Sequence, residues 1–187
     1  MIEWVVLIIL IVIAGAVVLI YNSLVDKKMK VNNAWSQIDV QLKRRADLIP
    51  NLIETVKGYA KFEKRVLTEV TEARTAIMKA KSPKESAKAE NMLSGALKTI
   101  FAVAEAYPKL RATENFAQLQ EEFSATENKI AYARQFYNDS VMLFNTAIAQ
   151  FPGNVFAALF GMGTPREYFE AEGQERKAVK ADFSDLA

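Results

Sequence analysis

The chain begins with an unbroken run of apolar side chains and then changes to apolar positions at helical spacing. Every residue from Trp4 to Tyr21 is apolar, aromatic or glycine. At the rise of an α-helix, this run covers about 27 Å, which is close to the hydrocarbon thickness of a bilayer. Aromatic rings favour the membrane–water interface, which suits the two end positions. The pattern predicts a transmembrane anchor over residues 1–22, with Trp4 and Tyr21 at the two interfaces.

A cleaved signal peptide is the alternative interpretation of this segment. Ala14, Gly15 and Ala16 imitate a small-residue cleavage site. The residues before the run, however, carry Glu3 and no lysine, and the apolar run continues past the would-be cut through residues 17–20. We therefore expect a retained anchor.

The basic residues around the anchor predict its orientation. Lys27, Lys28 and Lys30 follow the span, and nothing basic except the terminal amine precedes it. The positive-inside rule places such a basic flank in the cytoplasm. We expect a single-pass protein with its N-terminus outside and its body in the cytoplasm.

Beyond the anchor, apolar residues recur every three or four positions, which is the spacing of amphipathic helices. Prolines and cap residues divide the pattern into four helices. The first continues from the anchor through Leu42, the second begins at Asp47 and runs through Ile77, the third extends from Ser82 to Tyr107, and the fourth runs from near Thr113 to Pro152.

Two local signals mark helix boundaries. Ser82, Pro83 and Glu85 form a capping box, with a serine cap, a proline at the first helical position and a glutamate three residues after the cap. Pro50, within "ADLIPN", lacks a backbone N–H and crowds the preceding turn. This proline indicates either a reversal between two helices or a kink in one continuous helix.

Long helices with short connections favour an antiparallel up-and-down bundle. The sequence predicts an all-α protein in which the transmembrane helix (1–22) continues into a four-helix bundle (23–151), followed by a short irregular C-terminal segment (152–187). If "ADLIPN" is a reversal, polar residues from two turns meet at the membrane-distal end. We name this group the distal polar pole: Arg44, Arg45, Asp47, Glu105, Tyr107 and Glu114. The group either caps and pairs the helix ends or binds a partner.

The stretch "FPGNVFAALFGM" is expected at the opposite, membrane-proximal end. There Phe156 and Phe160 would lie beside Lys27, Lys28 and Lys30 and form a contact with lipid headgroups. The alternative is that the same residues close the open end of the bundle. If Pro50 only kinks one helix, the lipid contact fails.

Asn138 and Asn145 lie seven residues apart and therefore on one helix face. Such amides either fix the register between helices or form part of a subunit interface.

The composition excludes most catalytic chemistry. The chain has no cysteine and no histidine, which removes thiol nucleophiles, histidine acid–base catalysis and most transition-metal sites. A di-iron bundle would need Glu-x-x-His pairs, and no phosphate loop or nucleophile motif is present. We expect no enzyme activity, cofactor or metal. The net charge of +2, without a dense basic stripe, argues against nucleic-acid binding.

Several long segments resemble the bacterial LemA family: "YNSLVDKKMKVNNAWSQIDVQLKRRADLIPNLIETVKGYAKFE", "EAYPKLRATENFAQLQEE", "TENKIAYARQFYNDSVMLFN" and "FPGNVFAALFGM" followed by "YFEA". The resemblance implies one N-terminal helix in the bacterial inner membrane, a helical body and no established biochemical activity. A magnetosome-membrane protein of the same wider group suggests a role in membrane organisation. One departure is Phe62, where many relatives carry histidine.

These features predict a non-enzymatic, membrane-anchored structural or scaffold protein that acts through self-association and helix-mediated contacts. The expected partners are the lipid bilayer and further copies of the chain. A second hypothesis is an accessory subunit that tethers or regulates a membrane enzyme such as a protease. Surplus apolar positions beside the main stripes support self-association: Tyr59, Leu67, Met78, Phe101 and Tyr132.

Overall fold

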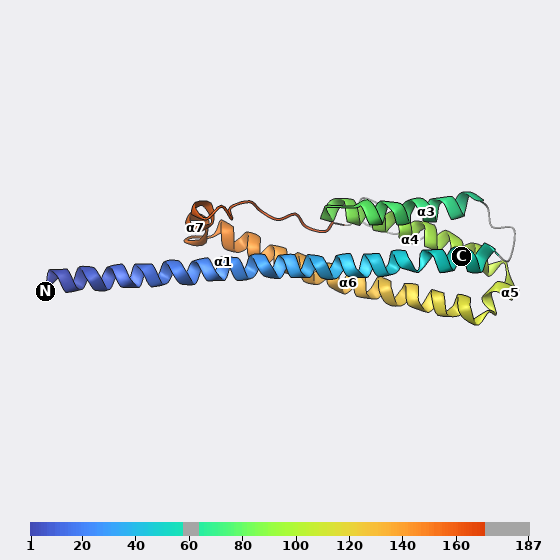
Figure 1. The fold of residues 1–187 in the computed structure, drawn as a ribbon, viewed down its shortest axis with the longest axis horizontal. Coiled ribbons are helices and arrows are strands. Elements are labelled where there is room, and N and C mark those ends of the chain that lie inside the picture. The colour runs from blue at the N-terminus through green and yellow to red at the C-terminus, as the bar shows by residue number, and fades with distance from the viewer. Residues whose placement is uncertain (58–63, 171–187) are drawn as a thin grey trace, which may run out of the picture. The chain divides into compact units, whose positions relative to one another are not determined.

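The computed structural model describes residues 1–57 and 64–170, and every regular element in that part of the chain is a helix (Figure 1). The all-α prediction is therefore confirmed. The helices are α1 (Ile2–Asp47), α2 (Ile49–Lys57), α3 (Lys64–Lys79), α4 (Pro83–Glu105), α5 (Pro108–Arg111), α6 (Glu114–Ala149) and α7 (Gly153–Leu159).

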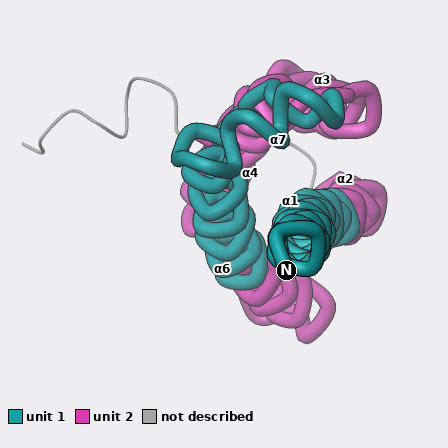
Figure 2. Tube along the Cα trace, turned by 90° about the vertical axis from the view of Figure 1, so that its left-hand side faces the viewer, with its two compact units in different colours: residues 1–41, 127–168 teal, residues 42–126, 169–187 magenta. Residues whose placement is uncertain are grey.

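The described residues form two compact units (Figure 2). Unit 1 comprises residues 1–41 and 127–168, and unit 2 comprises residues 42–126 and the described residues after 168. The long helices α1 and α6 contribute to both units. The predicted division at residues 22 and 151 rests on the end of the apolar run and on the change of composition near Pro152, and it stays a prediction.

Unit 1 contains the apolar run and the part of α1 that follows it. Among the described residues, the helix that begins at Ile2 is the one whose length and composition suit a membrane span, and none of its apolar window is buried inside the protein. Its burial pattern changes after the run. Val31, Ala34 and Ile38 recur at helical spacing on α1 and are at most 3% exposed, so the apolar face there packs inside the protein.

Unit 2 has the up-and-down arrangement that the sequence predicts. Its successive segments, which are the end of α1 with α2, then α3, α4 and the start of α6, run in alternating directions (Figure 1). The Phe101 ring on α4 lies 5.9 Å from that of Phe116 and 6.0 Å from that of Phe123, both on α6. This cluster joins the third and fourth segments.

The capping box at the start of α4 is present as predicted. Ser82 is in the extended backbone region, and its Oγ accepts a hydrogen bond of 3.2 Å from the Glu85 amide. The Glu85 carboxylate accepts from the amide of Lys81 at 2.8 Å. This donor is the residue before the cap, so the second bond of the box is displaced by one residue from the usual pattern. Pro83 occupies the first helical position, where a missing N–H costs nothing. The segment "SPKE" therefore fixes where α4 begins.

Pro50 marks a break in the helix and not a reversal. Only Leu48 lies between α1 and α2, and its amide donates to the Arg45 carbonyl at 3.3 Å, a tightened final turn. One residue is too short a connection to reverse two helices. The second helix expected from Asp47 through Ile77 is instead divided into α2 and α3, and α3 runs back past the end of α1 (Figure 1).

The Arg74 side chain confirms this return, because its Nε donates to the Ala46 carbonyl at 3.1 Å. Residues 58–63, between α2 and α3, lie outside the described residues. They include Tyr59, one of the surplus apolar positions, and Phe62, the departure from the LemA pattern. A reversal still occurs between α2 and α3, so the alternation of directions is kept although its position differs. The expectation that the lipid contact fails without a reversal at Pro50 is therefore wrong, because Phe160 still lies beside Tyr21 at the end of the apolar run.

Candidate functional site

The stretch "FPGNVFAALFGM", expected to be irregular, forms the short helix α7. Gly153 begins α7 where a Cβ atom would collide with the Ala147 carbonyl oxygen of α6, so glycine permits this close approach. At the other end Gly161 has φ +67°, the Met162 amide donates to the Ala157 carbonyl at 2.8 Å, and the Gly161 amide donates to Ala158. These bonds form a Schellman motif, which ends the helix sharply.

The end of α7 lies against the end of the apolar run of α1. The Phe160 and Tyr21 rings meet edge to face with centroids 4.9 Å apart, and the Phe156 ring is 6.3 Å from that of Phe160. Edge-to-face packing at this distance is a favourable aromatic contact. Both segments belong to unit 1, so residues far apart in sequence are brought together at the expected membrane interface.

The side chains of α7 and its flanks leave a large apolar surface uncovered. Phe151 is 83% exposed, Leu159 72% and Val155 54%. No charged residue occurs from Gln150 to Thr164. We call this surface the apolar foot: Phe151, Val155, Phe156, Leu159 and Phe160.

The three lysines after the span lie farther along α1. Lys27 Nζ donates to Ser23 Oγ at 2.6 Å, and Lys30 is 3.5 Å from the Asp26 carboxylate. Counted from Tyr21, Lys27 to Lys30 are about 9 to 14 Å along the helix axis. The lysines therefore lie farther from the apolar run than the ring of Phe160 does. Direct contact of the lysines with Phe156 or Phe160 stays a prediction. The anchoring role of Trp4 and Tyr21 also stays a prediction.

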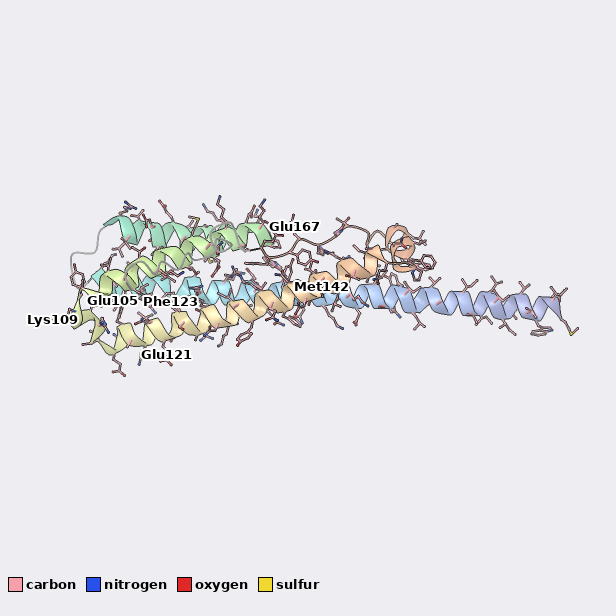
Figure 3. The ribbon with its side chains drawn as sticks, turned by 180° about the vertical axis from the view of Figure 1, so that it is seen from behind. Glu105, Lys109, Glu121, Phe123, Met142 and Glu167 are labelled. Carbon is pink, nitrogen blue, oxygen red and sulfur yellow. The ribbon has the colours of Figure 1, made fainter. Side chains whose placement is uncertain are left out.

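A segment after α7 returns along α6 and is held there by two side chains. The Asn145 amide donates to the Arg166 carbonyl at 2.9 Å, and its oxygen accepts from the Arg166 amide at 2.8 Å. The Tyr137 hydroxyl donates to the Glu167 carbonyl at 2.8 Å. Glu167 is labelled in this extended segment in Figure 3. We call residues 163–168 the strap.

Tyr137 connects three segments of unit 1. Besides its bond to the strap, its ring lies 5.6 Å from that of Trp35 on α1. Burial raises the pKa of the Tyr137 hydroxyl, a nearby Arg166 lowers it, and Glu167 raises it again. The Asn145 side-chain amide forms hydrogen bonds with the backbone of its own chain. The seven-residue spacing from Asn138 did not predict this contact. Asn138 itself is half-buried.

A groove of about 620 Å³ lies between α1 and α6 in unit 1. Three of its apolar side chains are strongly exposed: Tyr132 at 74%, Val40 at 59% and Phe136 at 49%. Polar side chains surround them. The groove is lined by Asn33, Ser36, Gln37, Val40, Gln41, Lys129, Tyr132, Ala133 and Phe136.

The distal polar pole is partly dispersed in unit 2. Arg44 and Asp47 are exposed on α1, and Asp47 lies about 15 Å along the helix before the end of α2. The other three pole residues flank α5 in the chain: Glu105, labelled in Figure 3, ends α4, Tyr107 precedes α5, and Glu114 begins α6. Glu105 and Glu114 are exposed, and Tyr107 is half-buried.

Arg45 belongs to the core of unit 2. Its Nη1 donates to Glu90 Oε1 at 2.8 Å, and the two side chains are 2% and 5% exposed. Ser94 Oγ donates to the same carboxylate at 3.2 Å. Glu90 is a core residue that the helical spacing did not predict. The available signal was its position in the apolar stripe of α4, three residues before Leu93.

Among residues 1–57 and 64–170, no group of three or more His, Cys, Asp and Glu side chains is close enough to hold a metal ion. The surfaces that the structure does present are helix faces, an apolar foot and a groove, all suited to contact with other molecules.

These features define an all-α protein in which, among the described residues, one helix has an exposed apolar window and continues directly into the body. The family model of the LemA family matches residues 34–183, and the chain belongs to this family.

Protein LemA of Metamycoplasma hominis is 29% identical over 169 residues, which cover 88% of this chain and 74% of that protein. Magnetosome protein MamQ 2 of Paramagnetospirillum magneticum is 24% identical over 176 residues, or 80% of this chain. Magnetosome protein MamQ of Magnetospirillum gryphiswaldense is 23% identical over 175 residues. The matched part spans 64% of each of these two magnetosome proteins, slightly less than two thirds.

Proposed function

We propose that this protein is a non-enzymatic scaffold, anchored in the bacterial inner membrane, that works by self-association through helix faces. Two features support the anchor, namely the exposed apolar window at the start of α1 and the membership of the LemA family. The magnetosome proteins among the relatives are consistent with a role in organising a membrane structure.

The observation that carries the proposal is the groove between α1 and α6. Tyr132 and Phe136 expose aromatic surface on α6, and Val40 exposes an aliphatic side chain on α1. Contiguous exposed apolar surface with a polar rim is typical of protein interfaces. Tyrosine is also among the residues that contribute most binding energy there.

The anchor explains why a second copy is the partner that fits. From Tyr21 to Gln41, α1 is uninterrupted, which places the groove residues of α1 about 18 to 30 Å along the helix from the end of the apolar run. All copies in one membrane therefore present the groove at the same height. Confinement to a surface also raises the effective concentration of equal faces, and equal faces form isologous contacts by two-fold symmetry.

The test is the mass of the full-length protein in mild detergent and in lipid nanodiscs, measured by light scattering over a range of concentrations. We expect a defined oligomer. The double variant Tyr132→Ser/Phe136→Ser should shift it to monomers at the same concentration. Met92→Ser on α4 is the matched control, because Met92 is 45% exposed but does not line the groove.

A monomeric mass for the unchanged protein at all concentrations would contradict the proposal. If that monomer co-purified with one membrane enzyme at a fixed ratio, the accessory-subunit hypothesis would replace it. An oligomer that persists in the groove variant would place the self-association on a different surface.

A further inference from the structure

We infer that the apolar foot is a second membrane contact, which inserts into the headgroup region of the bilayer beside the transmembrane helix. The inference rests on the proposed membrane anchor and adds a surface that the anchor alone does not require. The occupant of the foot is lipid, and the foot and the span both belong to unit 1.

The depth of the foot follows from one contact. If the run from Trp4 to Tyr21 spans the hydrocarbon, Tyr21 lies at the interface. The Phe160 ring is 4.9 Å from the Tyr21 ring, whereas the headgroup region on each side of a bilayer is about 5 to 8 Å thick. A ring at that distance from Tyr21 therefore lies within or directly against this region.

The chemistry of the foot suits that depth. Phe151, Val155 and Leu159 expose more than half of their surface, and the stretch from Gln150 to Thr164 carries no charge. Apolar side chains on a short helix beside an interface gain by burial among lipid headgroups and the upper acyl chains. In water the same side chains would form an exposed apolar patch.

The foot is also preformed. Gly153 permits the start of α7 to lie close to the Ala147 carbonyl of α6, the Asn154 amide donates to the Gln150 carbonyl at 2.9 Å, and the Schellman bonds at Gly161 and Met162 fix the end of α7. The two hydrogen bonds between the Asn145 amide and the Arg166 backbone hold the strap, residues 163–168, on α6. A fixed apolar surface loses little conformational entropy when it binds.

Two other interpretations make different predictions. A foot that only closes the end of the helices would not need Phe151 and Leu159 to be 83% and 72% exposed. A foot that binds a second copy of the chain would lose its contact when the protein is diluted within the membrane, whereas lipid contact is independent of protein density.

The experiment uses the full-length chain, which has no cysteine, with one introduced cysteine carrying an environment-sensitive fluorophore. The variants Leu159→Cys and Phe151→Cys report on the foot. Gln135→Cys is the matched control, because Gln135 is exposed on α6 within unit 1 and lies about 21 Å along that helix from its end. The protein is reconstituted into vesicles of phosphatidylcholine and phosphatidylglycerol that contain lipids with a quencher at headgroup depth.

We expect quenching at positions 159 and 151 to exceed that at position 135 several-fold, and to stay constant as the lipid-to-protein ratio rises. Quenching at the level of the control would overturn the inference, and so would shielding that disappears on dilution. Val12→Cys, in the middle of the apolar run, tests the anchor separately with quenchers placed deep in the acyl chains. If position 12 is quenched and position 159 is not, the foot fails while the anchor stands. If position 12 is not quenched, the anchor itself fails.

Discussion

Arg45 and Glu90 form an ion pair inside the apolar stripes of their helices. Arg45 lies between Leu42 and Ile49 in the buried spacing of α1 and α2, and Glu90 lies among the buried residues of α4. Charges at such positions need a partner, because the desolvation of an unpaired ion costs several kcal/mol. The sequence shows each charge within its stripe, but the pairing depends on how the helices are arranged.

This pair gives the first prediction. Glu90→Gln removes the buried carboxylate charge that lies 2.8 Å from the Arg45 guanidinium, so we expect a loss of about 3 to 5 kcal/mol in the free energy of unfolding. The double variant Arg45→Met/Glu90→Leu removes both charges and should recover most of that loss. Ser94→Ala, which removes only the Ser94 hydrogen bond to Glu90, should cost about 1 kcal/mol. Denaturant unfolding of the full-length protein in detergent measures all three, and a neutral Glu90→Gln would contradict the assignment.

Tyr137 gives the second prediction, which concerns pH. Its folded-state pKa is raised, mainly by burial, so the neutral hydroxyl that donates to Glu167 is favoured in the folded protein. The stabilisation is fully present below the ordinary tyrosine pKa of about 10 and is lost as pH rises through the higher folded-state pKa. We expect the phenolate absorbance of the folded protein to show a late component that Tyr137→Phe removes. A titration curve whose last component survives Tyr137→Phe would refute this.

At the scale of the elements, the start of α4 was the most predictable boundary, because a side chain caps it. A capping box is defined by four consecutive residues and needs no tertiary information.

We expect Ser82→Ala to lower the free energy of unfolding by about 1 kcal/mol, because the Glu85 amide loses its acceptor. Thr99→Ala on the exposed face of the same helix is the control. Thr99 only bonds back to the Gly95 carbonyl, so its removal should change stability by less than about 0.5 kcal/mol. Thermal unfolding of both variants side by side checks the difference, and equal effects would argue against the cap.

The helix ends without such caps were placed less well. No proline occurs between Lys57 and Lys64, so a continuous apolar stripe predicted one helix where the structure has α2 and α3. Pro50 was a misleading signal for a reversal, because a proline in the first turn of a helix is tolerated and does not reverse the chain. α7 was missed because seven residues with glycine and proline nearby carry too little periodicity.

The candidate sites also differ in how far local sequence predicts them. The sequence predicts the apolar character of the foot and places it near the span through the alternation of helix directions. The contact between Tyr21 and Phe160, the clasp of Asn145 on Arg166 and the groove beside Tyr132 join residues from distant parts of the chain. Their geometry depends on the relative rotation of helices, which apolar spacing sets only to within a face.

At the scale of the whole molecule, the remaining prediction is orientation. Lys27, Lys28 and Lys30 follow the apolar run. Asp26 pairs with Lys30 and offsets only part of their positive charge. The positive-inside rule counts lysine and arginine and gives little weight to acidic residues, so the N-terminus is expected outside the cell and the body in the cytoplasm. Protease added to intact spheroplasts should leave the body whole, and the same protease should digest it in inverted membrane vesicles.

A charge-exchange variant tests the cause of this orientation as well as the orientation itself. Replacing the three lysines with glutamine while introducing Ile2→Lys and Glu3→Lys moves the basic flank to the other side of the span. Because the charge bias around a single short span sets its topology, a substantial fraction of this variant should become sensitive to protease in spheroplasts. A matched variant with Lys79→Gln, Lys81→Gln and Lys84→Gln removes the same charge far from the span and should keep the original protection. If the body of the unchanged protein is digested from outside, the cytoplasmic placement is wrong, and the apolar foot would then contact the outer leaflet.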